Sequence, residues 1–208
     1  MRSNSRRPRS GADEPLDLLP RLLAGDEATF ALVVTRWHSG LHRLATAITG
    51  NASIGEEVVQ DAWASALRSL HTFEGRASLR TWVHRICAHL ALARSRQEAR
   101  SPVPADPSVL DLGAFDDRGA WSVPPERWLD ETPEALAARQ EVLACIERAV
   151  MALSVRQRAV ITLRDVQGFS AEEVSEILEV SDVHQRVLLH RARTRVRAAC
   201  DRYYRELG

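Results

Sequence analysis

The 208-residue sequence contains no lysine, so its 28 arginines alone balance its 28 acidic residues. Without lysine, amine-dependent chemistry such as a P-loop nucleotide site or a Schiff base is excluded. The sequence also has no apolar run of membrane-spanning length, and its N-terminus has arginines without the apolar stretch of a signal peptide. We therefore expect a cytoplasmic protein.

Cysteine is scarce as well. Cys87, Cys145 and Cys200 are odd in number and widely spaced inside helical patterns, which favours buried thiols over a disulfide framework. His84 and His89 lie beside Cys87, but no second ligand pair follows at the spacing of a structural zinc site. The sequence predicts no metal and no cofactor.

The zero net charge conceals a segmented distribution. Residues 1–12 carry four arginines and no acid, whereas residues 13–100 carry ten acids and ten arginines. Residues 101–141 carry nine acids and three arginines, and residues 142–208 carry nine acids and eleven arginines. An acidic segment therefore separates two more basic parts of the chain.

Residues 13–98 show helical periodicity without an alternating strand pattern. Three capping signals predict where the helices start, at Asp26, in the Ser53–Glu56 capping box and at Ser78. On the third helix, which we expect to run to about Gln97, four side chains share one flank: Trp82, Arg85, His89 and Arg96. Such a row can stack on and neutralise single-stranded DNA. Alternatively, Trp82 edges the core and the polar side chains are solvated.

Residues 101–131 contain five prolines among acidic and small residues, which is typical of an interdomain linker. Trp121 and Trp128 flank a Pro-Pro pair in this segment. They either dock on a partner or pack against a domain.

The last part of the chain predicts a four-helix unit. Thr132-Pro133 starts the first helix, and capping boxes begin at Ser154 and Ser170. The terminal helix is rich in arginine, and after Val183 only Asp201 and Glu206 oppose the arginines that follow. A helix, a turn and a cationic helix in this order predict a helix-turn-helix that binds DNA. A solvated basic face on an ordinary helix is the plainer alternative.

Several segments resemble the sigma-70 family of bacterial RNA polymerase sigma factors, specifically the extracytoplasmic-function (ECF) group. They are Glu56–Trp63, Phe73–Ile86, Leu153–Val160, Leu163–Ser170 and His190–Arg193. The resemblance implies an all-α protein with only two sigma domains. In that interpretation an Arg-rich tail (1–12), expected to be disordered, precedes sigma domain 2 (13–100), and a Pro-rich acidic linker (101–131) leads to sigma domain 4 (132–208).

The resemblance also implies sites and partners. Core polymerase, through its β′ clamp coiled coil, would be bound by Glu57, Gln60 and Asp61, and the β flap is a further expected contact. The melted minus-10 element would be bound by Phe73, Arg76, Arg80, Trp82, Arg85, His89 and Arg96. The minus-35 element would be bound by Arg156, Arg158, His184, Gln185, Arg186, Val187, His190, Arg191 and Arg193. An anti-sigma factor, able to hold the protein at the membrane, is a further expected partner.

The chain departs from the family pattern at three places. His89 and Ala93 stand where many relatives have Asn and Asp, and Ser181–His184 replaces a turn with Pro before Gly-Thr. Val187 and Leu188 stand where Ser and Arg are common. We expect Asp182 and Gln185 to form a capping pair at the altered turn. We also hypothesise that Val183 or Val187 contacts a thymine methyl, with Arg186 or Arg191 reading guanine nearby.

Three other functions compete with this interpretation. A conventional helix-turn-helix regulator would use residues 154–200 without core polymerase. An enzyme is disfavoured, because no nucleophile elbow, paired-histidine metal motif or Gly-rich phosphate loop occurs, and we expect no small-molecule substrate. A protein adaptor independent of polymerase is the third alternative.

Overall fold

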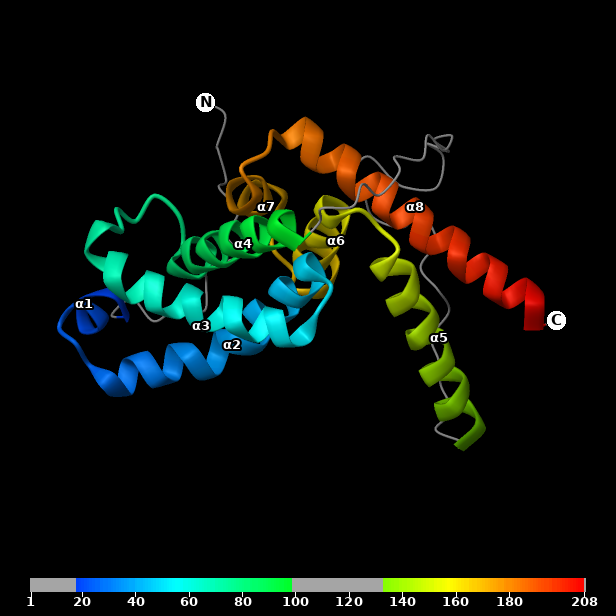
Figure 1. The fold of residues 1–208 in the computed structure, drawn as a ribbon, viewed down its shortest axis with the longest axis horizontal. Helices are drawn as coiled ribbons and strands as arrows, with labels where there is room; N and C mark the ends of the chain where they lie inside the picture. Colours follow the sequence, from blue (N-terminus) through cyan, green and yellow to red (C-terminus); the bar gives the residue numbers. More distant parts are fainter. Residues whose placement is uncertain (1–17, 99–132, 208) are drawn as a thin grey trace, which may run out of the picture.

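The computed structural model describes residues 18–98 and 133–207, and all regular elements within these ranges are helical (Figure 1). The first lobe consists of α1 (Leu18–Leu23), α2 (Glu27–Thr49), α3 (Ala52–Ser69), η1 (Leu70–Thr72) and α4 (Leu79–Glu98). The second lobe consists of α5 (Pro133–Met151), α6 (Val155–Ile161), η3 (Thr162–Val166), α7 (Ala171–Leu178) and α8 (Asp182–Leu207). The predicted all-α architecture of two helical lobes is confirmed. The predicted tail, the linker with Trp121 and Trp128, and the Thr132 cap lie outside the described residues.

The helix starts in the first lobe follow short polar side chains. Asp26 caps α2 as predicted, since its Oδ1 accepts the backbone N–H of Ala28 at 3.1 Å and of Thr29 at 3.3 Å. Ser78 caps α4, with its Oγ accepting the N–H of Thr81 at 3.1 Å.

The predicted cap of α3 is wrong. Asn51 fills that role in place of Ser53, because its Oδ1 accepts the backbone N–H of Ser53 at 2.9 Å and of Ile54 at 3.2 Å. Asn51 follows the left-handed Gly50 directly in extended conformation, so the helix begins at Ala52.

Helices α2, α3 and α4 bury their apolar sides against one another. The periodicity predicts Leu67 in this core, but its side chain is 49% exposed and Ala66 is buried instead. The buried face of α3 is centred on Val59 and Ala62, and Ala66 continues that row. On α4, Ile86 and Leu90 pack at the core edge, while Cys87 and Ala91 are fully buried.

The second lobe starts its helices at both predicted capping boxes, Ser154 with Gln157 and Ser170 with Glu173. The predicted Asp182–Gln185 capping pair is wrong. The Oγ of Ser181 accepts the N–H of His184 at 3.2 Å, so Asp182 already lies in the first turn of α8.

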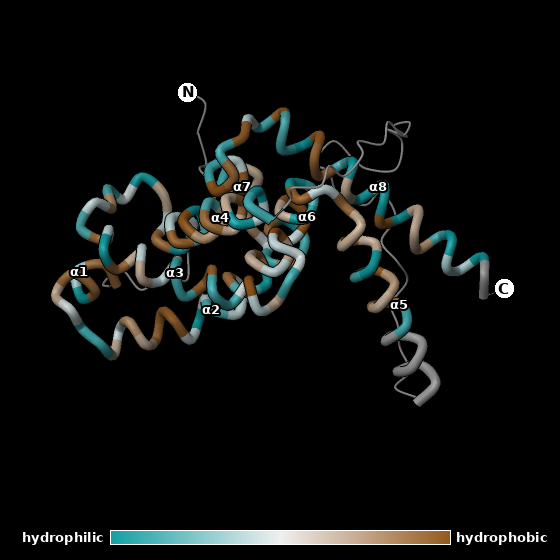
Figure 2. Tube along the Cα trace, in the orientation of Figure 1, coloured by the Kyte–Doolittle hydropathy of each residue, from teal (hydrophilic) through white to brown (hydrophobic). Residues whose placement is uncertain are grey.

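The two lobes pack against each other along α4 and the C-terminal half of α2. Helix α7 lies against α4, and α6 and η3 lie against α2, whereas α5 and the far end of α8 extend away from the first lobe (Figure 1). The buried apolar residues form one core cluster that includes side chains of both lobes. Figure 2 shows that hydrophilic residues dominate the extended end of α8. The fold therefore places the helix-turn-helix directly beside α4 of the first lobe.

Candidate nucleic-acid interface

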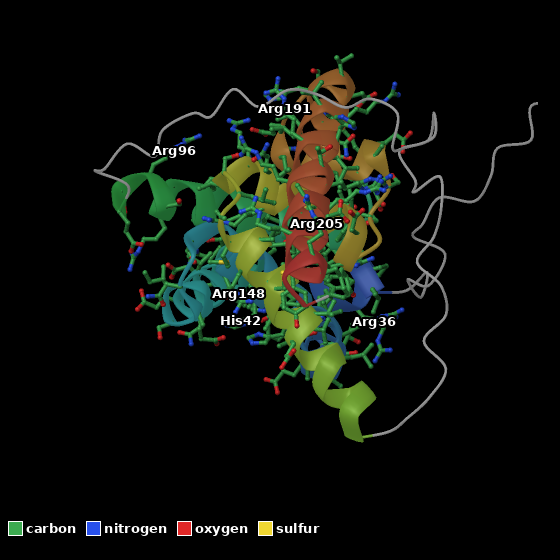
Figure 3. The ribbon with its side chains drawn as sticks, turned by 90° about the vertical axis from the view of Figure 1, so that its right-hand side faces the viewer. Arg36, His42, Arg96, Arg148, Arg191 and Arg205 are labelled. Atoms are coloured by element: carbon green, nitrogen blue, oxygen red, sulfur yellow. The ribbon has the colours of Figure 1, made fainter. Side chains whose placement is uncertain are left out.

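Helices α7 and α8 form the predicted helix-turn-helix, and the first turns of α8 carry its exposed side chains. His184, Arg186, Val187 and Arg191 are exposed, and Val183 is 71% exposed. In Figure 3, Arg191 on α8 and Arg96 on α4 project outward. Guanidinium and imidazole groups at the start of a helix are suited to base edges and phosphates in a major groove.

Gln185 differs from its neighbours on α8. Its side chain is only 1% exposed, and its amide nitrogen has no hydrogen-bond partner among the described residues. The helical period explains this placement, because Gln185 precedes the buried Leu188, Leu189 and Ala192 by three, four and seven residues. In this conformation Gln185 faces the core of the second lobe and is not available to DNA.

Two of the arginines predicted at the minus-35 site form contacts inside the protein. Arg193 binds Asp165 through two hydrogen bonds, from Nε at 2.9 Å and from Nη2 at 2.7 Å. Arg158 donates to the carbonyl oxygens of Ala47 and Ile48 at the end of α2, and burial lowers its pKa. A cation near the last carbonyls of a helix is favoured by the helix dipole. Arg156 is exposed and His190 is partly buried.

The flank of α4 brings together most of the residues predicted for the minus-10 site. The ring of Phe73, from the loop before α4, lies 5.3 Å from the ring of Trp82, and both are partly buried. Arg85 and His89 both contact Glu179 at the end of α7. Of the other members, Arg76, paired with Glu74, and Arg96 near the end of the helix are exposed. Arg80 is partly buried and donates from Nη2 to the carbonyl oxygen of Gln167 at 3.2 Å.

The outer face of α3 carries the three residues predicted to bind core polymerase. Glu57, Gln60 and Asp61 are exposed. Glu57 accepts a hydrogen bond from Arg94 Nη2 at 2.7 Å, and Gln60 donates to Glu56 at 3.4 Å. Asp61 is left as an exposed carboxylate on this face.

The contact between the lobes is built around His84. Its ring is 1% exposed and lies 4.8 Å from the ring of Phe169, while its Nδ1 is 2.8 Å from the carbonyl oxygen of Arg80. Its Nε2 lies 3.1 Å from Oε1 of Gln167, whose Nε2 donates to the carbonyl oxygen of Gly40 at 2.9 Å. Burial is the main cause that lowers the pKa of His84 from 6.5 to about 4, so the ring is neutral at neutral pH.

The sequence did not point to Gln167, Phe169 or Glu179 as interface residues. Gln167 follows the wide turn of η3, where its N–H donates to the carbonyl oxygen of Thr162 five residues earlier. Gln167 and Phe169 lie in the Leu163–Ser170 segment that resembles the sigma-70 family, but the resemblance assigned neither of them an interface role.

Cys87 is used for packing. The Cys87 thiol is fully buried, lies 3.7 Å from the carbonyl oxygen of Leu41, and has a pKa raised by burial to about 12. Within residues 18–98 and 133–207, no group of three His, Cys, Asp or Glu side chains could hold a metal ion. Over the same described residues, no helix is both long enough and apolar enough to cross a membrane.

Comparison with known proteins defines the class to which these two lobes belong. The family model of Sigma-70 region 2 matches residues 33–101, and the family model of Sigma-70 region 4 matches residues 143–196. The ECF RNA polymerase sigma factor SigX of Bacillus subtilis is 31% identical over 167 residues, which cover 79% of this chain and 80% of SigX. The ECF RNA polymerase sigma-E factor of Escherichia coli is 30% identical over 176 residues, covering 82% of this chain and 86% of that factor.

Solved structures share the fold. CnrH, in complex with the cytosolic domain of CnrY, aligns with a TM-score of 0.60 at 22% identity, over 88% of this chain and 95% of CnrH. RpoE of Bartonella quintana, in complex with the anti-sigma factor NepR, aligns with a TM-score of 0.56 at 19% identity, over 83% of this chain and 96% of RpoE. The chain belongs to the sigma-70 family of RNA polymerase sigma factors, in its ECF group.

Proposed function

We propose that this ECF sigma factor binds core RNA polymerase through the outer face of α3, with Gln60 and Asp61 at its centre and Glu57 beside them. The exposed carboxylate of Asp61 next to an amide offers both charge and hydrogen bonding to a basic protein surface. The β′ clamp coiled coil is the partner proposed for this face, and the β flap is proposed for the second lobe.

Promoter recognition is divided between the lobes in this proposal. The Phe73–Trp82 pair and the cationic side chains of α4 would hold the unstacked minus-10 strand, since aromatic contacts offset the cost of unstacking a base. The exposed residues of α8 would read the minus-35 duplex, and Arg156 would anchor a phosphate. The paired presence of a helix-turn-helix and an aromatic–cationic flank on a separate lobe carries the proposal.

The protein would act by binding alone, in the cytoplasm, without a reaction of its own. An anti-sigma factor is a proposed regulator, and the complex of Bartonella quintana RpoE with NepR supports it by analogy. A conventional helix-turn-helix regulator is the weaker candidate, because it would have no use for the α3 face or the α4 flank.

Run-off transcription with core polymerase tests the proposal, using pooled genomic promoter fragments with and without the protein. We expect transcripts that depend on the protein and that fall when Asp61→Ala or Trp82→Ala is introduced. Glu147→Ala is a matched control, since Glu147 is an exposed acid on α5, outside the proposed surfaces. Duplex binding without any polymerase-dependent transcript would instead favour a conventional helix-turn-helix regulator.

A further inference from the structure

Glu179 has an unusual backbone conformation. Among the described residues it is the one non-glycine residue with a positive φ, at φ 51° and ψ 51°. It follows the last residue of α7, Leu178, and its N–H donates to the carbonyl oxygen of Ser175. Glycine is the usual residue in this left-handed position, because a Cβ atom is disfavoured there. The chain therefore has a carboxylate where the backbone alone would favour glycine.

That carboxylate reaches across to the first lobe. Oε1 of Glu179 accepts a hydrogen bond from Nη2 of Arg85, and Oε2 lies 3.0 Å from Nε2 of His89. Arg85 and His89 are one helical turn apart on α4, so the two oxygens bridge adjacent turns. Burial raises the pKa of Glu179, but the hydrogen bond from Arg85 and the charges of His89 and Arg85 lower it by more than burial raises it. The net pKa is therefore below the usual value, and the carboxyl group stays ionised.

The same helix is covered further towards its start. Arg80 donates from Nη2 to the carbonyl oxygen of Gln167 at 3.2 Å, and Thr81 Oγ1 lies 3.3 Å from Oε1 of Glu173. Three of the residues proposed for the minus-10 strand, Arg80, Arg85 and His89, thus have second-lobe groups as their present partners. A DNA strand that bound these three side chains would have to displace the second-lobe groups.

We infer that Glu179 occupies on α4 the position of a DNA phosphate, adds to the packing around Phe169 in holding the free protein closed, and is displaced when the minus-10 strand binds. An anionic oxygen pair bound by a guanidinium and an imidazole is the contact that a phosphate would make. The inference rests on the proposed function, because it assumes that Arg85 and His89 bind DNA. The Arg85, His89 and Glu179 side chains are 42%, 43% and 49% exposed, so water and salt weaken the contact enough for a competing strand to replace it.

Small-angle X-ray scattering on the full chain without DNA or polymerase tests the closure. Glu179→Arg should increase the radius of gyration at low salt, and adding Arg85→Glu should restore it by reversing the pair. Glu176→Gln is the matched control, since Glu176 is an exposed acid on α7, three residues before Glu179. A Glu179→Arg protein with the radius of the native chain would overturn the inference.

Two milder variants separate the charge from the backbone. Glu179→Gln removes the charge, and Glu179→Gly also relieves the left-handed conformation without harming the end of α7. With core polymerase, both should lower the protein concentration that gives half-maximal run-off transcript by about fivefold, the effect of losing one half-exposed ion-pair cluster. Glu176→Gln should leave that concentration unchanged.

The two proposals fail in different ways. If the native chain yields no polymerase-dependent transcript, the proposed function fails, and the scattering experiment still decides whether Glu179 closes the protein. If the Glu179 variants open but the half-maximal concentration stays the same, closure does not compete with the minus-10 strand and the inference is wrong.

Discussion

The guanidinium carbon of Arg80 lies 4.0 Å from the centre of the Phe169 ring, and this contact joins the two lobes. Phe169 is fully buried and packs against Arg80 and His84 of α4. An aromatic side chain of the second lobe is therefore buried against the first lobe. Cation–π contacts of this type are strongest where water is excluded. The pair is therefore a structural link between the two proposed DNA-binding surfaces.

Removing the Phe169 ring should weaken the whole fold. We expect Phe169→Ala to lower the free energy of unfolding by about 3–5 kcal/mol, because a fully buried phenylalanine leaves a cavity when truncated. Urea unfolding followed by circular dichroism measures the change. Val166→Ala is the control, since Val166 is 60% exposed and should cost less than about 0.5 kcal/mol. Equal stability of the two variants would show that the Phe169 ring does not contribute to the core.

Acid should destabilise the protein through His84. Its pKa is about 4 in the folded protein against 6.5 in the unfolded chain, so below pH 6.5 the unfolded chain takes up a proton that the folded protein excludes. Stability is unaffected above pH 6.5 and falls as the pH drops from 6.5 towards 4. Between pH 7.5 and 5.0 the loss should be about 2 kcal/mol.

Comparison with His84→Gln isolates this contribution, since glutamine does not titrate. The groups around His84 are the same in both proteins: the Arg80 carbonyl and guanidinium, Gln167 and Phe169. Arg36 and Arg43 line the same polar cavity of about 220 Å³. An equal pH dependence of the two unfolding free energies would show that His84 is not the responsible group.

Gln185 should not read the minus-35 element. Gln185→Met should leave base preference at every minus-35 position unchanged, because the side chain faces the core of the second lobe. Stability should stay the same or rise by about 1 kcal/mol, since a buried amide nitrogen without a partner is removed. Arg186→Ala is the comparison, because Arg186 is exposed on the next position of α8 and its loss should weaken binding. A changed base preference in Gln185→Met would mean that α8 rotates on binding DNA.

The exposed valines of α8 give a separate prediction. Val183 is 71% and Val187 39% exposed, which leaves both free to contact a thymine methyl in the major groove. Exchanging thymine for uracil one position at a time should weaken holoenzyme binding about threefold at one position, the effect of one lost methyl contact. Val187→Ala and Val183→Ala should identify which valine is responsible. If no position responds to uracil, the thymine-methyl hypothesis is wrong.

The sequence by itself determined where most helices of this protein begin and which of their faces are apolar. The caps at Asp26, Ser78, Ser154 and Ser170 and the three- and four-residue apolar steps predicted the main helices, because capping and amphipathicity depend on neighbours within a few positions. The errors in the helix caps were choices between neighbouring polar residues, as at Asn51 and Ser181, where a shift of one or two residues changes which side chain reaches the free N–H groups. The exposed face of α3 followed from the same period.

Only the tertiary structure decided which predicted contacts are available. Arg158 binds carbonyl oxygens at the end of α2, and Gln185 lies in the core of the second lobe. Arg85 and His89 contact Glu179, which is 90 or more positions away in the sequence. A helical period identifies which side of a helix is apolar, but it does not specify what packs against the polar side. That choice depends on how the two lobes meet, which is set by long-range packing of residues such as Phe169 and His84 whose partners lie on different helices.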